Sequence, residues 1–299
     1  PVKKGWWKNY VLGVVEGVLE KRSISENFDI LFSGNIPSGA GLSSSAALEN
    51  SIVFSLNELF DLQLTKKEMI FISQKAEHDF VGVKCGIMDQ FASMFGESNA
   101  AILLDCKNLN AEIFPIYFNE YELLLINTNV KHSLADSAYN NRREVCEKVA
   151  KMLHVSALRE VSESQLNSIK DQLSKEDFDK VIYVIQENNR VLEASKALQN
   201  KNIDKFGQLM FASHDGLQHQ YKVSCKELDF LVDLAKENPA VIGARMMGGG
   251  FGGCTINLVY KEKSKEYQEQ IKKAYAKAFL KECSFYNVHL NNGVQRVHL

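Results

Sequence analysis

The feature that most constrains this chain is a run of small residues, GNIPSGAGLSSSAALE, at positions 34–49. Glycines allow the backbone to approach a ligand closely, and a helix that begins directly after them presents free N–H groups with a partial positive charge. The apolar spacing of residues 47–61 predicts such a helix, and the alternating residues 28–34 predict a strand before the loop. A strand, a glycine/serine loop and a helix in this order favour a site for a phosphate group.

The serines of this loop leave more than one interpretation open. Ser43, Ser44 and Ser45 carry hydroxyls that cap a helix, donate to phosphate oxygens or accept a metal ion. Taken alone, such a loop more often marks a Ser-capped helix after a flexible turn. The pattern GxxxxGK[ST] does not occur in the chain, which excludes the P-loop with its lysine.

The composition is that of an ordinary globular protein. Hydrophobic residues make up 45% and charged residues 24% of the 299 positions, which excludes a disordered or fibrous chain, and the length suggests roughly two domains. The formal net charge of −2 provides no field that would attract nucleic acid or an anionic membrane. Neither is therefore expected as a partner, and any anionic ligand must be held by local groups.

The chain also lacks signs of export or membrane insertion. No apolar stretch approaches the roughly 18 to 20 residues that a membrane span requires, and residues 1–10 contain no secretory leader. The cysteines form no CxxC pairs, so we expect a cytoplasmic protein with buried, reduced thiols. They lie at positions 85, 106, 146, 225, 254 and 283.

The remaining periodicity predicts a mixture of helices and strands in a two-layer α+β fold. A domain boundary near residue 119 is weakly marked, because no Pro/Gly/Ser linker is present. Helices are predicted at 11–19, 66–80, 140–153, 158–172, 175–199, 203–217 and 262–281, and strands at 100–105, 121–128, within 244–260 and at 284–290.

Two further stretches indicate a functional site. In CGIMDQF, residues 85–91, Asp89 stands alone among apolar neighbours, where a carboxylate is costly to bury without a purpose or a partner. In GGGFGGC, residues 248–254, five glycines lie between strand-like segments, more than a simple hairpin needs. Together with the glycine/serine loop, these stretches favour a ligand site over a purely structural module.

These motifs carry a resemblance that covers nearly the whole chain. The chain resembles the galactokinases, a family of the GHMP small-molecule kinases. The resemblance implies a two-domain GHMP kinase fold, with an N-terminal domain of the ribosomal protein S5 domain 2-like type at 1–118, truncated at its start, and a ferredoxin-like C-terminal domain at 119–299. It rests on GNIPSGAGLSSSAALE, QKAEHDFVGVKCGIMDQFAS, NTNVKHSLADSAYNNRREVCE, YKVSCKELDFLV and ARMMGGGFGGCT.

The resemblance implies phosphorylation of galactose at C1 with ATP and Mg²⁺ as the reagents. It implies that Ser45 and Glu77 coordinate Mg²⁺, although an isolated Glu of this kind is by default a surface helix residue. It places Trp7 and Tyr10 near adenine, with a buried core position as the alternative. It assigns the phosphates of ATP to Gly39, Ala40, Gly41, Leu42, Ser43, Ser44 and Ser45.

The resemblance also implies a sugar site. Asp89 matches the catalytic aspartate, acting as general base or orienting the nucleophile, with a helix-capping Asp as the alternative. Gly86 matches a position where the backbone approaches the sugar, and Tyr139 matches a tyrosine that contacts a sugar hydroxyl. The loop 248–254 would close over the phosphate end, although Met247 stands where the family usually carries Thr.

Other polar residues of these motifs are interpreted as structural. Arg142 and Arg143 are expected to bond to acidic neighbours such as Glu144 or Glu147 rather than to phosphate. His78 and His132 are likewise expected to be satisfied polar residues and not acid/base groups.

One departure from the family pattern qualifies the expected activity. The first sugar-binding motif of galactokinases is not found before GWWKNY, residues 5–10, so we expect this chain alone to be a weak or inactive kinase. Two alternatives stay open: an N-acetylgalactosamine kinase, and a galactokinase-like sugar sensor without turnover. The expected partners are small molecules, galactose and ATP, and the expected state is a monomer.

Overall fold

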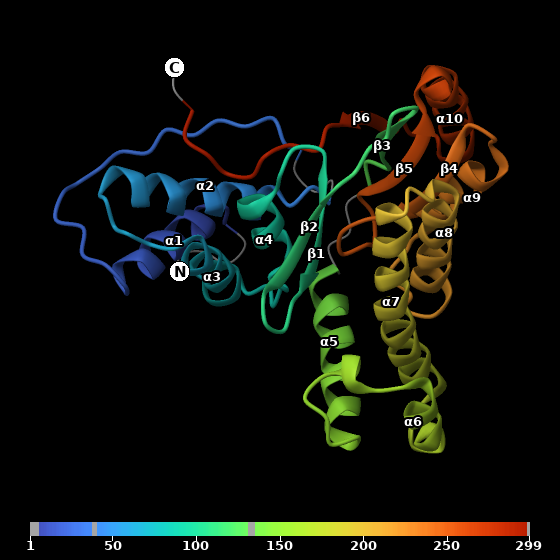
Figure 1. The fold of residues 1–299 in the computed structure, drawn as a ribbon, viewed down its shortest axis with the longest axis horizontal. Helices are drawn as coiled ribbons and strands as arrows, with labels where there is room; N and C mark the ends of the chain where they lie inside the picture. The colour runs from blue at the N-terminus through green and yellow to red at the C-terminus, as the bar shows by residue number, and fades with distance from the viewer. Residues whose placement is uncertain (1–5, 38–40, 131–134, 298–299) are drawn as a thin grey trace. The chain divides into compact units, whose positions relative to one another are not determined.

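The computed structural model describes residues 6–37, 41–130 and 135–297, with the backbone alone at 135–139. It divides into two compact units (Figure 1). The first unit contains Leu42–Ile116 together with the described parts of Pro1–Ser38 and Leu290–Leu299, and the second contains Tyr117–His289 and Gly41. The mixture of helices and sheet agrees with the predicted α+β class, and the predicted domain limits at 118 and 119 stay a prediction.

The first unit is a set of packed helices with a β-hairpin. Helix α2 confirms the helix predicted after the small-residue loop, and α3 begins at a capping box in which Thr65 and Glu68 satisfy each other's backbone amides. The elements are α1 (Lys8–Leu19), α2 (Ser44–Leu59), α3 (Lys66–Ala76), the π-helical turn η1 (Glu77–Val81), α4 (Met88–Phe95), β1 (Ala100–Asp105) and β2 (Asn110–Pro115).

Two glycines bring α1 and α3 into close contact. A Cβ atom added to Gly13 would lie 2.6 Å from the Cβ of Ala76, and one added to Gly17 would lie 2.9 Å from Ile72. The two helices therefore approach until backbone meets side chain, with Val14 of α1 fully buried beside them. This packing fixes the direction of α3 and of the π-helical turn that continues it.

The strand predicted at 28–34 is not formed, which corrects the sequence analysis. This segment has no regular secondary structure, and the side chain of Leu31 is 98% exposed. Ile30 and Phe32 are also exposed. Among the described residues β1 pairs only with β2, so the segment has no neighbouring strand to satisfy its backbone groups. Its alternating sequence does not reveal whether another strand pairs with it.

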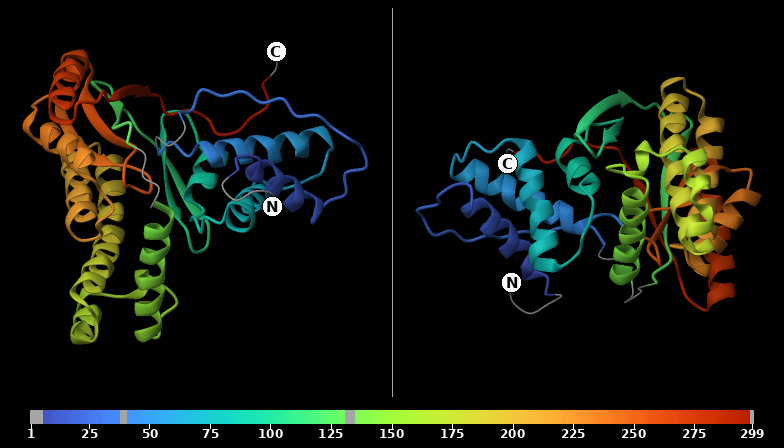
Figure 2. Two further views of the ribbon diagram at one scale, coloured as in Figure 1. Left: turned by 180° about the vertical axis from the view of Figure 1, so that it is seen from behind. Right: turned by 90° about the horizontal axis from the view of Figure 1, so that it is seen from below.

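The second unit is built on a four-stranded antiparallel sheet of order β4-β5-β3-β6. Helices α8 and α9 pack on β4, and α7 runs beside α8 (Figures 1 and 2). The strands are β3 (Tyr121–Asn127), β4 (Val241–Met246), β5 (Cys254–Tyr260) and β6 (Ser284–Val288), and the helices are α5 (Ala135–Met152), η2 (Leu158–Glu160), α6 (Glu163–Ser168), η3 (Lys170–Gln172), α7 (Lys175–Gln199), α8 (Ile203–His219), α9 (Lys226–Glu237), η4 (Lys261–Lys263) and α10 (Ser264–Phe279).

Most elements of the second unit were predicted, and the differences from the predictions lie in both units. The continuous helix expected at 158–172 is broken into η2, α6 and η3, because Ser162 caps a new helix in its middle. Helix α9 and, in the first unit, strand β2 were not anticipated. Cys106 is exposed, contrary to the expectation of uniformly buried thiols, while Cys254 and Cys283 are buried. Within the described residues no helix combines the length and apolar character needed to cross a membrane.

Candidate active site

The predicted phosphate loop leads into α2 without a side-chain cap. Ser43 occupies the N-cap position with a left-handed φ of 52°, and its hydroxyl accepts no capping hydrogen bond. Ser44 and Ser45 form the first turn of α2, where amides have no intrahelical partner. The alternative of a simple Ser-capped helix therefore loses its main support, although a role in binding is not tested by this geometry. Gly39 and Ala40 lie outside the described residues.

Gly41 is one of the few positions where the backbone requires glycine. Its φ is 73°, and a Cβ atom added to it would lie 3.3 Å from the carbonyl oxygen of Met247, within the second unit to which Gly41 is assigned. A Cβ added to Gly248 would in turn lie 3.2 Å from the Cα of Gly41. Leu42, the next predicted phosphate-loop residue, is half-buried at the start of the first unit's main segment.

Glu77 lies in the first unit at the start of the π-helical turn, and its side chain is 6% exposed. It is therefore not the surface helix residue that an isolated Glu would be. π-helical turns are frequent at functional sites because the extra residue re-aims the side chains that follow. Ser45 and Glu77 offer a hydroxyl and a carboxylate, the oxygen donors that suit Mg²⁺.

A buried polar cluster, which sequence analysis missed, lies between α2, α3 and α4. Ser73 donates to Asn50 over 2.8 Å, and Asn50 donates to the backbone carbonyl of Gln90 over 2.8 Å. All three residues are no more than 1% exposed. Polar residues on the apolar face of a predicted helix were the available signal. The cluster ties the residue next to Asp89 to the helix that follows the phosphate loop.

Glu49 belongs to the same region and is unusual among the described acids. It is fully buried, and neither carboxyl oxygen has a hydrogen-bond partner. Burial, and then the negative charge of Glu77, raise the pKa of Glu49 from 4.5 to about 10. The neighbouring amide of Gln90 offsets part of this rise, although it does not reach hydrogen-bond geometry. Glu49 is therefore a neutral acid at pH 7, one helical turn after Ser45.

Asp89 is exposed in the first turn of α4, so it avoids the burial cost that its apolar neighbours suggested. Two side chains fix the backbone that leads to it: His78 donates from Nε2 to the carbonyl of Cys85 over 2.9 Å, and Gln74 donates to the same oxygen over 3.3 Å. His78 is thus a satisfied polar residue, as expected. A Cβ atom on Gly86 would meet nothing within 4 Å, which leaves open space beside this backbone.

Trp7 and Tyr139 are the remaining residues that the resemblance assigned to the site. Trp7 precedes α1 and is 49% exposed, with its ring edge-to-face against Phe32 at 5.7 Å, so it is not the core residue of the alternative interpretation. Tyr139 lies on α5, and its side chain is outside the described part of the chain, as is His132. The roles assigned to Trp7 and Tyr139 stay predictions.

The two neighbouring arginines of α5 have different partners. Arg143 forms the expected ion pair with Glu147 at 2.9 Å. Arg142 donates to the backbone carbonyls of Tyr221 and Lys222, partners that the sequence analysis did not anticipate.

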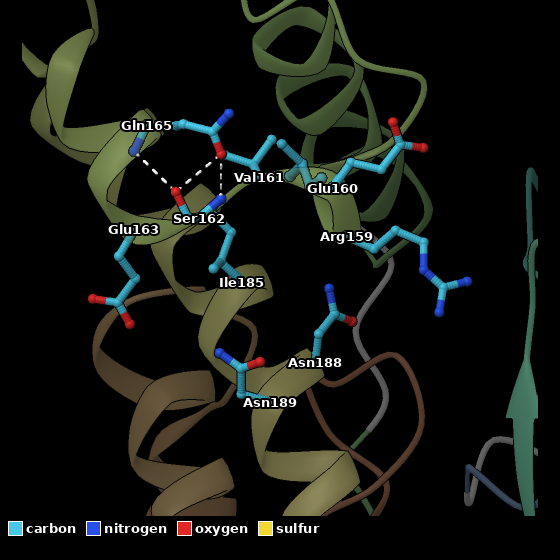
Figure 3. Close-up of a pocket in the computed structure, with 10 residues that line it drawn as sticks. Arg159, Glu160, Val161, Ser162, Glu163, Gln165, Ile185, Asn188 and Asn189 are labelled. Carbon is cyan, nitrogen blue, oxygen red and sulfur yellow. Dashed lines mark hydrogen bonds between the residues drawn. The ribbon is translucent and has the colours of Figure 1, made fainter.

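A pocket in the second unit contains none of the predicted site residues. It has a volume of about 370 Å³ and lies between η2, the start of α6 and α7, with Arg159, Asn188 and Asn189 among its lining residues (Figure 3). Ser162 and Gln165, which also line the pocket, are hydrogen-bonded to each other in a capping box (Figure 3). Within the described residues, no group of three or more His, Cys, Asp or Glu side chains forms a metal cage.

Comparison with known families gives matches in both units. The family described as GHMP kinases N terminal domain matches residues 9–97, and the family described as GHMP kinases C terminal matches residues 194–280. These matches contain the phosphate loop, Glu77 and Asp89 in the first case and the loop 248–254 in the second.

Individual relatives extend this similarity along the chain. A galactokinase of Thermotoga neapolitana is 42% identical over 292 residues, which cover 97% of this chain and 82% of the relative. A galactokinase of Clostridium acetobutylicum is 40% identical over 99% of this chain and 78% of its own length. The crystal structure of Lactococcus lactis galactokinase complexed with galactose superposes with a TM-score of 0.94 at 35% identity, covering 99% of this chain and 78% of that one.

Proposed function

Since this chain belongs to the galactokinase family of the GHMP kinases, we propose that it transfers the terminal phosphoryl group of ATP to the C1 hydroxyl of galactose. The observation that carries this proposal is the identity of about 40% with galactokinases over nearly the entire chain. A solved galactokinase that binds galactose and has nearly the same fold supports the choice of sugar. Residues of both units then take the following roles.

The start of α2 binds the phosphates of ATP. Gly41 and Leu42 lead into this helix end, where the first-turn amides have no intrahelical partner and the Ser43 hydroxyl makes no capping bond. The helix dipole favours anions there. Gly39 and Ala40 extend this loop in the sequence. Support comes from the absence of a side-chain cap at Ser43, which leaves its hydroxyl available for an oxygen of the substrate.

Ser45 and Glu77 hold the magnesium ion. Mg²⁺ usually takes one or two protein oxygens and fills its other positions with water and substrate phosphate, which matches this sparse donor set. Support comes from the burial of Glu77, whose negative charge helps to raise the pKa of the neighbouring Glu49 carboxyl. When bound, the ion neutralises charge that develops on the phosphates.

Asp89 orients and deprotonates the sugar hydroxyl that attacks the phosphorus atom. Its exposure in the first turn of α4 leaves it accessible to a substrate, and the open space at Gly86 allows the sugar ring to approach the backbone. The hydroxyl proton passes to the Asp89 carboxylate. The oxygen on C1 forms the new bond to the terminal phosphorus atom, and the bond from that phosphorus to the ADP oxygen breaks. Tyr139 contributes a sugar contact, and Trp7 contributes stacking area near adenine.

The test is an assay of galactose 1-phosphate formation with radiolabelled ATP, Mg²⁺ and galactose. We expect slow formation by this chain and a fall of roughly 10²- to 10⁴-fold in Asp89→Asn, the range typical for loss of a general base. Asp79→Asn is the matched control, because Asp79 is an exposed acid of the neighbouring π-helical turn and should leave the rate unchanged. Product formation that is equal in Asp89→Asn and the unaltered chain would contradict the assigned base.

A further inference from the structure

The loop of residues 247–253, here called the glycine-rich loop, adopts a conformation that needs external support. Gly248, Gly250, Gly252 and Gly253 all have positive φ, and so does Phe251, at 59°. A non-glycine residue in this region is uncommon and persists only where its surroundings fix it. The residues around Phe251 should therefore include the groups that hold the loop.

The segment 221–223, which follows α8, supplies the framework for the loop. The amide of Phe251 donates to the carbonyl of Val223 over 2.7 Å. A Cβ atom added to Gly250 would lie only 2.0 Å from the same oxygen, so the two backbones are in direct contact. The Phe251 ring also packs against a buried cluster that includes Val223.

The side chain of Arg142, on helix α5, binds the same segment 221–223. Its Nε donates to the carbonyl of Tyr221 over 3.3 Å, and its terminal amino group donates to the carbonyl of Lys222 over 2.8 Å. The carbonyls of three consecutive residues thus accept hydrogen bonds from only two residues. Those of Tyr221 and Lys222 accept from Arg142, and that of Val223 accepts from Phe251. The Arg142 guanidinium also lies over the Phe251 ring, 5.6 Å from its centroid.

We propose that Arg142 is a positioning residue that holds the glycine-rich loop, through Phe251 and the carbonyls of 221–223, in the form that binds the phosphate end of ATP. Arginine suits this task because its planar fork donates along two directions while its face stacks on an aromatic ring. Arg143 points elsewhere to Glu147 and serves as the matched control. The part that concerns ATP rests on the proposed function, whereas the hold on the loop does not.

Two measurements on the ligand-free and ligand-bound chain test the proposal, with the variants Arg142→Gln, Arg142→Lys and Arg143→Gln. Hydrogen exchange of the amides at 248–254 should accelerate in Arg142→Gln, less in Arg142→Lys, and stay unchanged in Arg143→Gln. In calorimetric titrations, the dissociation constant of a non-hydrolysable ATP analogue with Mg²⁺ should rise roughly tenfold in Arg142→Gln, because a charge-assisted hydrogen bond and a cation–π contact are lost. The dissociation constant of galactose should stay unchanged.

The outcomes separate this proposal from the proposed function. Unchanged exchange in Arg142→Gln, or an equal loss of affinity for galactose and the ATP analogue, overturns the positioning role. Faster loop exchange and weaker binding of the analogue, in a chain that forms no galactose 1-phosphate, would uphold the positioning role and reject the proposed function. A globally unfolded Arg142→Gln would be recognised by accelerated exchange across the whole sheet, and Phe251→Leu then provides the second variant, with the same loop-restricted exchange and loss of ATP affinity expected.

Discussion

The side-chain amide of Asn50 donates a 2.8 Å hydrogen bond to the backbone carbonyl of Gln90, the residue that follows Asp89. Asn50 in turn accepts from Ser73, so α3, α2 and α4 are joined in a buried chain of two bonds. The helix that follows the phosphate loop thereby sets the position of the proposed base.

Asn50→Ala should destabilise the first unit and displace α4. The hydroxyl of Ser73 would lose its buried acceptor and the carbonyl of Gln90 its side-chain donor, at a cost of about 2 kcal/mol in the free energy of unfolding. Ser73→Ala should cost about 1 kcal/mol, because only one bond is lost. Urea unfolding of both single variants and the double variant measures these effects. A double variant whose loss equals the sum of the single losses would contradict the linked chain.

Glu49→Gln should change how stability depends on pH. The carboxyl of Glu49 has a folded pKa of about 10 against 4.5 when unfolded, so unfolding releases a proton between these values. Stability of the unaltered chain should therefore fall as pH rises through this window, by at most about 1.4 kcal/mol per pH unit from this group. Glutamine cannot ionise and removes this contribution.

The check is a pair of thermal unfolding series from pH 5 to pH 9. The advantage of Glu49→Gln over the unaltered chain should grow with pH, and parallel curves would show that Glu49 is not neutral in the folded state. Glu58→Gln on the same helix, at an exposed position, is the control and should not alter the pH dependence.

Glu77→Gln should lower the affinity for Mg²⁺ more than it lowers the stability of the fold. A neutral amide is a poorer ligand than a carboxylate for a hard cation, so the half-saturating Mg²⁺ concentration should rise by roughly tenfold. Titration of Mg²⁺ against binding of the ATP analogue gives this value without requiring turnover. An equal shift in Asp79→Asn would indicate a general charge effect instead of coordination.

Gly13→Ala should destabilise the contact between α1 and α3. The added methyl group would lie 2.6 Å from Ala76, closer than real carbon contacts, so the helices must separate at a cost of about 1 to 3 kcal/mol. Gly34→Ala is the matched control, because its Cβ meets nothing within 4 Å. Circular dichroism during denaturation distinguishes the two, and equal stability of the variants would reject the close packing of α1 on α3.

The sequence was informative where structure depends on neighbours along the chain. Helix α7 spans Lys175–Gln199, the limits predicted from its periodicity, because a helix satisfies its own backbone groups and needs one apolar face. Strand pairing depends on distant segments, and residues 28–34 show the consequence: the strand pattern is present, but no strand in the described part of the chain pairs with it.

Site residues were predictable as motifs but not as a network. Asp89 and Glu77 were identified through the galactokinase motifs, and their proposed roles stay predictions. Glu49 was not identified as a site residue, since its neutral form follows from burial that no local pattern shows. Arg142 and Arg143 looked equivalent, although about 100° of helix rotation separates adjacent side chains and sends them to different partners.

The tail after β6 packs on the first unit, so that unit is built from segments on both sides of the second unit in the sequence. Asn291 and Asn292 accept hydrogen bonds from Ser98, and the Gly293 amide donates to Gly96. The second unit is therefore an insertion between two pieces of the first. A recombinant fragment that stops at Ile116 would lack a strip of its own surface, whereas a circular permutant that joins the tail to that fragment would restore it. Dissecting this protein into independently expressed halves therefore requires two cuts.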